Sequence, residues 1–279
     1  MQTPDELPAV VLICHEQDRL DTEGLASWLA CTMRLVGLIV IRDETNRLWR
    51  AARREIRRVG WLRFLDVIAF RLYAGLWLAR RDTAWKDREL ARLRACYPAD
   101  LQKVPRIVVS NPNANPAREF LARLCPDLVI ARCKFILKPT IFELARVGTF
   151  ALHPGICPEY RNAHGCFWAL VNGDRDRVGM TLLRIDNGID TGPIYLQATS
   201  AIDEVRESHI VIQYRVVLEH LHAIGRTLLS ICRGQGPAPL PTAGRTSAAW
   251  GQPRLTEYLR WRYEARRSRR HARRVATLS

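Results

Sequence analysis

Short, unbroken runs of apolar residues alternate with segments of helical periodicity in the first part of the chain. Residues 9–14 form one apolar run, and residues 35–41 form the next. Between them, residues 21–35 carry apolar side chains at helical spacing. Unbroken apolar runs are typical of strands that are buried on both faces of a parallel sheet. The order strand, helix, strand therefore predicts a βαβ unit.

The same alternation returns after a break. Further strands are predicted at residues 106–109, 127–131, 149–152 and 178–185, with helices at 117–124, 139–146, 164–172, 210–232 and 255–274. The fold class predicted is α/β, with a mostly parallel, Rossmann-like sheet, a helical insertion and a helical C-terminal extension. We expect a catalytic domain over residues 1–200, with the insertion at 45–100, and an extension with an Arg-rich tail over 201–279.

Charge divides the chain in the same way. Of the formal net charge of +15, residues 46–81 carry ten Arg against two acids, and residues 261–279 carry seven Arg against one. The presumed catalytic body is therefore close to neutral. The most lipid-like window, residues 60–79, holds Arg63, Asp66 and Arg71, which are costly inside a bilayer. With a polar N-terminus, which does not resemble a secretory signal, this predicts a cytoplasmic protein.

The Arg-rich insertion has three interpretations. The first is a solvated helical face. The second is a helix that lies on an anionic membrane surface, as basic helices with Trp and Phe do, and the third is a segment that binds nucleic acid. Residues 61–65 and 76–78 are too apolar for a nucleic-acid face alone, so nucleic acid is not an expected partner. Peripheral membrane contact stays open beside the solvated face, and the sequence is compatible with a homodimer.

Candidate chemistry is concentrated between His153 and Asp190. His153 follows the predicted strand 149–152, and Asp190 lies in a Gly-rich loop after the strand 178–185. Ligands of open parallel sheets bind at the carboxyl ends of the strands, so we expect the two side chains to meet there. A neighbouring carboxylate would orient the imidazole and favour its charged form. Such a pair suits a reaction in which a nucleophile loses a proton while an oxyanion develops.

Five motifs in this stretch occur in a fixed order. They are His153-Pro154, Pro158-Glu159-Tyr160-Arg161, FWALVNG at 167–173, VGMT at 178–181 and DNGIDTGPI at 186–194. Together they resemble the 10-formyltetrahydrofolate-dependent formyltransferase family. The resemblance covers roughly residues 104–200, with weaker agreement at 9–41.

The resemblance implies an enzyme in which His153 and Asp190 are catalytic and no metal takes part. An amine of a small-molecule substrate would attack the formyl carbon of 10-formyltetrahydrofolate, His153 would stabilise the oxyanion, and Asp190 would hold the imidazole and accept the proton. The donor pocket would be lined by Phe135, Ile136, Leu137, Ile185, Asp186 and Gly188. The candidate substrate-binding residues are Tyr160, Arg161, Asn162 and His164, although Tyr160 and Arg161 suit turn packing equally well and His164 suits a helix start.

One position departs from the family pattern. The family has an asparagine two residues before the histidine, and this chain has Ala151. Losing one oxyanion donor typically costs a factor of about 10² to 10³ in rate. Three outcomes stay open: Asn162 or His164 supplies the donor, the enzyme is slow, or the chain is a catalytically degenerate binding protein.

The class of formyl acceptor is inferred by excluding other members of the family. The family member that formylates initiator methionyl-tRNA carries a C-terminal β-barrel-like domain, whereas residues 200–279 predict helices and an Arg-rich tail. Purine-pathway members lack an insertion like the one predicted here. We therefore expect an amine on a small metabolite, such as a nucleotide-linked amino sugar.

Overall fold

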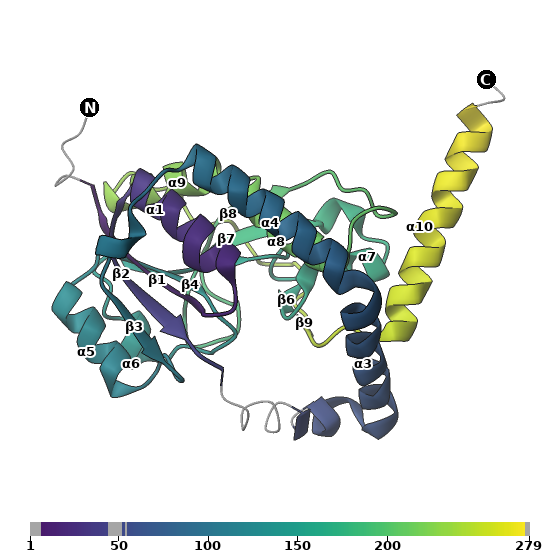
Figure 1. The fold of residues 1–279 in the computed structure, drawn as a ribbon, viewed down its shortest axis with the longest axis horizontal. Coiled ribbons are helices and arrows are strands. Elements are labelled where there is room, and N and C mark those ends of the chain that lie inside the picture. Colours follow the sequence, from purple (N-terminus) through teal and green to yellow (C-terminus); the bar gives the residue numbers. More distant parts are fainter. Residues whose placement is uncertain (1–6, 44–51, 54, 277–279) are drawn as a thin grey trace.

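A seven-stranded sheet forms the centre of the protein (Figure 1). The structure, a computed structural model, describes residues 7–43, 52–53 and 55–276, so parts of the predicted insertion (45–51 and 54) lie outside the described residues. The strand order is β3-β2-β1-β4-β5-β7-β8, and neighbours from β3 to β5 are parallel. This confirms the predicted α/β class with a mostly parallel sheet. The strands are β1 (Ala9–His15), β2 (Arg34–Ile41), β3 (Arg106–Val109), β4 (Leu128–Arg132), β5 (Gly148–His153), β7 (Gly179–Arg184) and β8 (Ile194–Thr199).

The last two strands of the sheet run against the others. β7 pairs antiparallel with β5, and β8 pairs antiparallel with β7. The sequence analysis missed β8, because this edge strand is only partly buried and lacks an unbroken apolar run.

Helices cover both faces of the sheet (Figure 1). On β1, Val10 and Leu12 face one core cluster, and Val11 and Ile13 face the other, as side chains alternate along a strand. The first cluster includes α1 (Ala26–Thr32), α4 (Ala79–Cys96), α7 (Gly165–Val171), α8 (His209–Leu218) and α9 (Leu221–Cys232). The second includes α5 (Asn115–Leu124) and α6 (Pro139–Phe142).

Two predicted helices differ from the structure. The predicted helix 139–146 ends at Phe142, because the backbone N–H groups of Arg146 and Val147 bond to the carbonyls of Pro126 and Asp127 beside β4. The predicted helix 210–232 is two helices, α8 and α9. His220 leaves the helical conformation between them, and its Nε2 lies 3.2 Å from the carbonyl of Thr199 at the end of β8.

The insertion is helical where the structure describes it. Residues 52–53 and 55–59 are helical, and α3 (Trp61–Tyr73) continues through a π-helical turn (Ala74–Leu78) into α4. Short helical turns of the π or 3₁₀ type also occur at Leu20–Leu25, Leu101–Lys103 and Arg175–Arg177. None of the described helices combines the length and apolar character that crossing a bilayer requires.

The C-terminal helix packs against the insertion. α10 (Leu255–Ala276) begins beside α3, and Tyr258 lies with its ring centroid 5.2 Å from that of Phe70 and 5.6 Å from that of Tyr73 (Figure 1). Just before α10, β9 (Ala249–Trp250) pairs with β6 (Arg161–Asn162). The helix that carries the second basic segment thus packs on the first, and β9, which precedes this helix, pairs with the stretch that carries the candidate chemistry.

Candidate active site

His153 is the last residue of β5 and is buried, with 6% of its surface exposed. Both ring nitrogens face an acceptor. Nδ1 lies 3.4 Å from the Asp190 carboxylate, and Nε2 lies 2.7 Å from the backbone carbonyl of Tyr160. A ring with an acceptor on each nitrogen can donate two hydrogen bonds, and only the charged imidazolium has two N–H groups.

The pKa of His153 follows from these surroundings. Burial lowers it, since a charge is costly away from water, but the negative charge of Asp190, the contact with Cys157 and the bond to the Tyr160 carbonyl act in the opposite direction. Together they raise the pKa from 6.5 to about 10. His153 is therefore an imidazolium at neutral pH.

Asp190 reaches His153 by a route that the sequence analysis did not foresee. We expected both residues at the same edge of the sheet, but β7 is antiparallel to β5, so its last residue, Arg184, lies opposite Phe150. The loop after β7 therefore starts three residues before His153 along β5 and returns to it. Asp190 sits in this loop with a left-handed backbone (φ 51°), and its Oδ2 accepts a hydrogen bond from the Asn162 amide at 2.8 Å.

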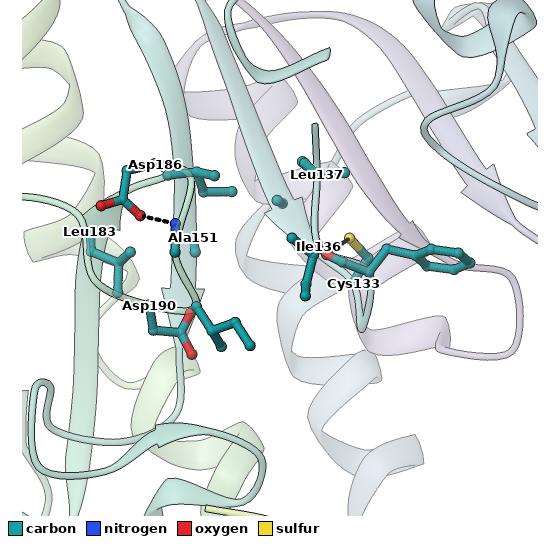
Figure 2. A pocket seen from close by; sticks show the side chains of 12 residues that line it. Cys133, Ile136, Leu137, Ala151, Leu183, Asp186 and Asp190 are labelled. Carbon is teal, nitrogen blue, oxygen red and sulfur yellow. Dashed lines mark hydrogen bonds between the residues drawn. The ribbon is translucent and has the colours of Figure 1, made fainter. Parts of the chain in front are cut away.

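A small cavity lies beside the pair. Its walls come from the segment after β4 and from the loop after β7, which face each other in Figure 2. The lining includes all six residues that the resemblance assigned to the donor pocket: Phe135, Ile136, Leu137, Ile185, Asp186 and Gly188. Asp190 also lines it, whereas His153 stands behind Asp190 and is not among the lining residues.

Ala151 forms part of the cavity wall. It pairs with Ala131 on β4 and with Leu183 on β7, and all three line the cavity. Figure 2 shows Ala151 and Asp190 on the same side of the cavity. An asparagine at position 151 would thus be next to the space that Asp190 borders, and its replacement by alanine removes a polar group from that place.

The side chains of the predicted substrate-binding turn are engaged elsewhere. The Tyr160 hydroxyl donates to Asp174, Arg161 donates to the carbonyl of Ile189, and the Asn162 amide group donates to the carbonyl of Trp250. None is among the residues that line the cavity. In this structure the turn therefore contacts the site through its backbone, which binds both His153 and Asp190.

His164 begins α7 with a left-handed backbone (φ 57°) and lies away from the cavity. Its Nδ1 accepts a hydrogen bond from the Gln213 side chain at 2.9 Å, and its ring centroid is 5.8 Å from that of His209. Burial, followed by the charge of Lys134, lowers the pKa of His164 to about 3. His164 is therefore a neutral residue of the junction between α7 and α8.

The sequence analysis did not single out Arg245 and Trp250, which hold the turn in place. Arg245 forms two hydrogen bonds with the buried carboxylate of Glu159, at 3.0 and 2.7 Å. Trp250 donates from Nε1 to the Glu159 carbonyl, and its ring stacks on Tyr160 and Trp168 at centroid distances of 5.8 and 4.9 Å. A two-residue strand such as β9 has no periodic pattern by which sequence could predict it. The presence of a tryptophan in a mainly polar segment was the one feature of the sequence that could have indicated a buried contact here.

The segment that carries the site is similar to a known protein family. Residues 92–226, which include the His153–Asp190 pair and all residues that line the cavity, match the family model described as formyl transferase. The matched segment contains all five motifs between His153 and Ile194.

Curated relatives carry two different names. The methionyl-tRNA formyltransferase of Pelotomaculum thermopropionicum is 30% identical over 155 residues, which are 53% of this chain and 46% of that protein. The GDP-perosamine N-formyltransferase of Brucella melitensis biotype 1 is 26% identical over 160 residues, 53% of this chain and 61% of that protein. The chain spans about half the length of the curated relatives that it matches.

A sugar N-formyltransferase from Shewanella sp. FDAARGOS_354 has a similar solved structure. The TM-score is 0.53 with 14% sequence identity, and the match covers 91% of this chain and 87% of that one. At this identity the similarity shows a common fold, which agrees with the predicted Rossmann-like formyltransferase architecture.

Proposed function

We propose that this chain transfers a formyl group from 10-formyltetrahydrofolate to an amine of a small metabolite, with a nucleotide-linked amino sugar as the favoured class. The observation that carries the proposal is the pair of buried His153 and half-buried Asp190, whose carboxylate borders the cavity. The match of residues 92–226 to the formyl transferase family model supports the reaction type. The Brucella relative, named for an amino-sugar acceptor, supports the acceptor class.

The cavity suits the donor in chemistry. Ligand pockets typically combine apolar walls with a few polar groups. Here Ile136, Leu137 and Leu183 provide apolar walls that fit the flat face of a heteroaromatic ring, while the Asp186 loop provides polar groups. Asp186 accepts from the Gly188 amide and from Thr191, as the dashed bond in Figure 2 shows for the former, so the loop wall is ordered by its own hydrogen bonds.

The donor supplies an activated formyl carbon, and this chain's residues supply charge and a proton acceptor. The amine nitrogen forms a bond to that carbon, the bond from the carbon to the donor nitrogen breaks, and the donor nitrogen gains a proton. Asp190, which lines the cavity, accepts the proton that the amine loses. The imidazolium of His153 lies 3.4 Å from the Asp190 carboxylate, and its positive charge stabilises negative charge that develops on the formyl oxygen.

A direct assay tests this proposal. Full-length protein is incubated with 10-formyltetrahydrofolate and a panel of nucleotide-linked amino sugars and other primary amines, and formylated product is identified by mass spectrometry. We expect product with at least one amino sugar, and a loss of about 10²-fold or more in His153→Ala and Asp190→Ala. Donor binding without product from any amine would overturn the proposal in favour of a binding protein.

A further inference from the structure

α3 presents an apolar stripe to solvent. Trp61, Leu65, Leu72 and Leu76 recur at spacings of three to four residues or multiples of them, which places them on one side of the helix. Their exposed fractions lie between 57% and 75%, and neighbouring Leu62 is 85% exposed. Single exposed apolar residues are ordinary, but a contiguous group of this size marks an interaction site. We call these five residues the α3 stripe.

The opposite side of α3 is packed, so the stripe is presented by an anchored element. Val67 and Phe70 on the opposite side are buried, and Phe70 contacts the rings of His209 and Tyr258 at centroid distances of 4.9 and 5.2 Å. Asp66 accepts hydrogen bonds from the backbone and hydroxyl of Thr256 at the start of α10. The stripe is therefore the side of α3 that the fold leaves uncovered.

The charge around the stripe is strongly positive. Residues 57–81 contain six arginines, two before the stripe (57 and 58), two within α3 (63 and 71) and two after it (80 and 81), against a single acid, Asp66. The helix that packs on α3 continues the same chemistry: α10 exposes Leu259 and Tyr263, followed by exposed Arg266, Arg267 and Arg270. Apolar side chains in a helical stripe, flanked by arginines, fit the acyl and phosphate regions of a bilayer surface.

We propose that the α3 stripe and its flanking arginines bind the surface of an anionic lipid bilayer. The leucines and Trp61 enter the boundary between headgroups and acyl chains, and the arginines bind the phosphates. This proposal goes beyond formyl transfer and does not depend on it.

Two other occupants fit the surface less well. A symmetric dimer would place the same patch of both copies face to face, and so arginines against arginines. Nucleic acid would match the arginines but would leave the exposed leucines without an apolar partner. A bilayer with anionic lipids provides an apolar partner for the α3 stripe and phosphates for the flanking arginines.

Vesicle co-sedimentation of the full chain tests the proposal. The protein is mixed with vesicles of phosphatidylcholine alone and with vesicles that contain phosphatidylglycerol, at physiological salt. We expect binding to the anionic vesicles, at least about tenfold weaker binding to the neutral ones, and a decline with increasing salt. The variant Leu65→Ser/Leu72→Ser/Leu76→Ser should bind anionic vesicles at least about tenfold more weakly, because three apolar contacts are lost. Leu240→Ser, at a leucine 40% exposed in another segment, is the matched control and should bind normally.

The fold of each variant is checked by circular dichroism and thermal melting, and the changed side chains are exposed, so both properties should be retained. Brominated lipids give a second readout: they should quench part of the tryptophan fluorescence, and less of it in Trp61→Phe. Equal binding by the triple variant and the unchanged chain would overturn the proposal. So would a dimer in analytical ultracentrifugation that the triple variant abolishes, in a protein that does not bind vesicles.

Discussion

The backbone carbonyl of Tyr160 lies 2.7 Å from Nε2 of His153, on the side of the ring away from Asp190. The turn that carries Tyr160 also donates the Asn162 amide to Asp190. One short segment thus fixes both members of the pair through its backbone. Its own side chains are held by Asp174, Ile189 and Trp250, so the orientation of the imidazole depends on how firmly this turn is held.

The charge of Asp190 maintains the charge of His153. In Asp190→Asn the negative charge that attracts the His153 proton is lost, while burial still disfavours the imidazolium. The pKa of His153 should therefore fall well below its value of about 10. NMR titration of isotope-labelled histidine measures this directly. Asp186→Asn is the matched control, since Asp186 lies in the same loop but bonds to Gly188 and Thr191, and it should leave the His153 titration unchanged. An unaltered His153 titration in Asp190→Asn would contradict the assigned electrostatics.

Stability should depend on pH through the same histidine. The folded-state pKa of about 10 exceeds the ordinary value of 6.5, so protonated His153 stabilises the fold fully below pH 6.5, and this contribution is lost as the pH rises toward 10. The difference in unfolding free energy between the unchanged chain and His153→Gln should therefore shrink between pH 7 and pH 10, measured by urea denaturation. A difference that grows with pH would show that His153 is buried in its neutral form.

Replacing Ala151 by the asparagine that the family has at this position should raise the rate of formyl transfer. Asn162 and His164, the two candidate substitutes, donate or accept elsewhere and do not line the cavity. We therefore expect Ala151→Asn to increase the formyl transfer rate by about tenfold or more, toward the 10² to 10³ that one oxyanion donor typically provides. Ala131→Asn is the matched control, because it adds the same group to the cavity from the neighbouring strand and should not increase the rate. Equal rates in Ala151→Asn and the unchanged chain would mean that another group already supplies the donor.

Arg245 should contribute to stability through Glu159. Arg245→Ala leaves a buried carboxylate without its bidentate partner, and we expect a loss of about 1–3 kcal/mol in unfolding free energy. Arg146→Ala, which removes a more exposed pair with Asp127, should cost about 0–1 kcal/mol. The comparison is made by urea denaturation at pH 7. A loss at Arg245 no greater than that at Arg146 would mean that the strand pair β6–β9 holds the turn without it.

The features that sequence predicted well are those that local pattern determines. The unbroken apolar run 9–14 became β1, buried on both faces. The six residues that the family resemblance assigned to the donor pocket line one cavity. What sequence did not predict depends on contacts between distant segments. The direction of β7 relative to β5 decides how Asp190 approaches His153, and the six-residue sequence of β7 does not indicate strand direction.

The role of Trp250 in the C-terminal segment was not predicted from the sequence for the same reason. Trp250 lies in a stretch without periodicity, and its importance arises from pairing with β6 and stacking on Tyr160, more than eighty residues earlier in the chain. The division of the chain at residue 200 stays a prediction. The described contacts of α10 with α3 and of β9 with β6 connect both sides of that division.

The central claim is that the cavity between residues 133–137 and 183–190 binds the formyl donor beside the His153–Asp190 pair. Isothermal titration calorimetry with a non-reactive 10-formylfolate analogue tests it most directly, using Ala151→Leu to fill the cavity and Ala122→Leu, at an exposed position on α5, as the matched control. We predict one binding site per chain, at least about tenfold weaker binding in Ala151→Leu, and unchanged binding in Ala122→Leu. Equal affinity in all three proteins, or no binding to the unchanged chain, would contradict the claim.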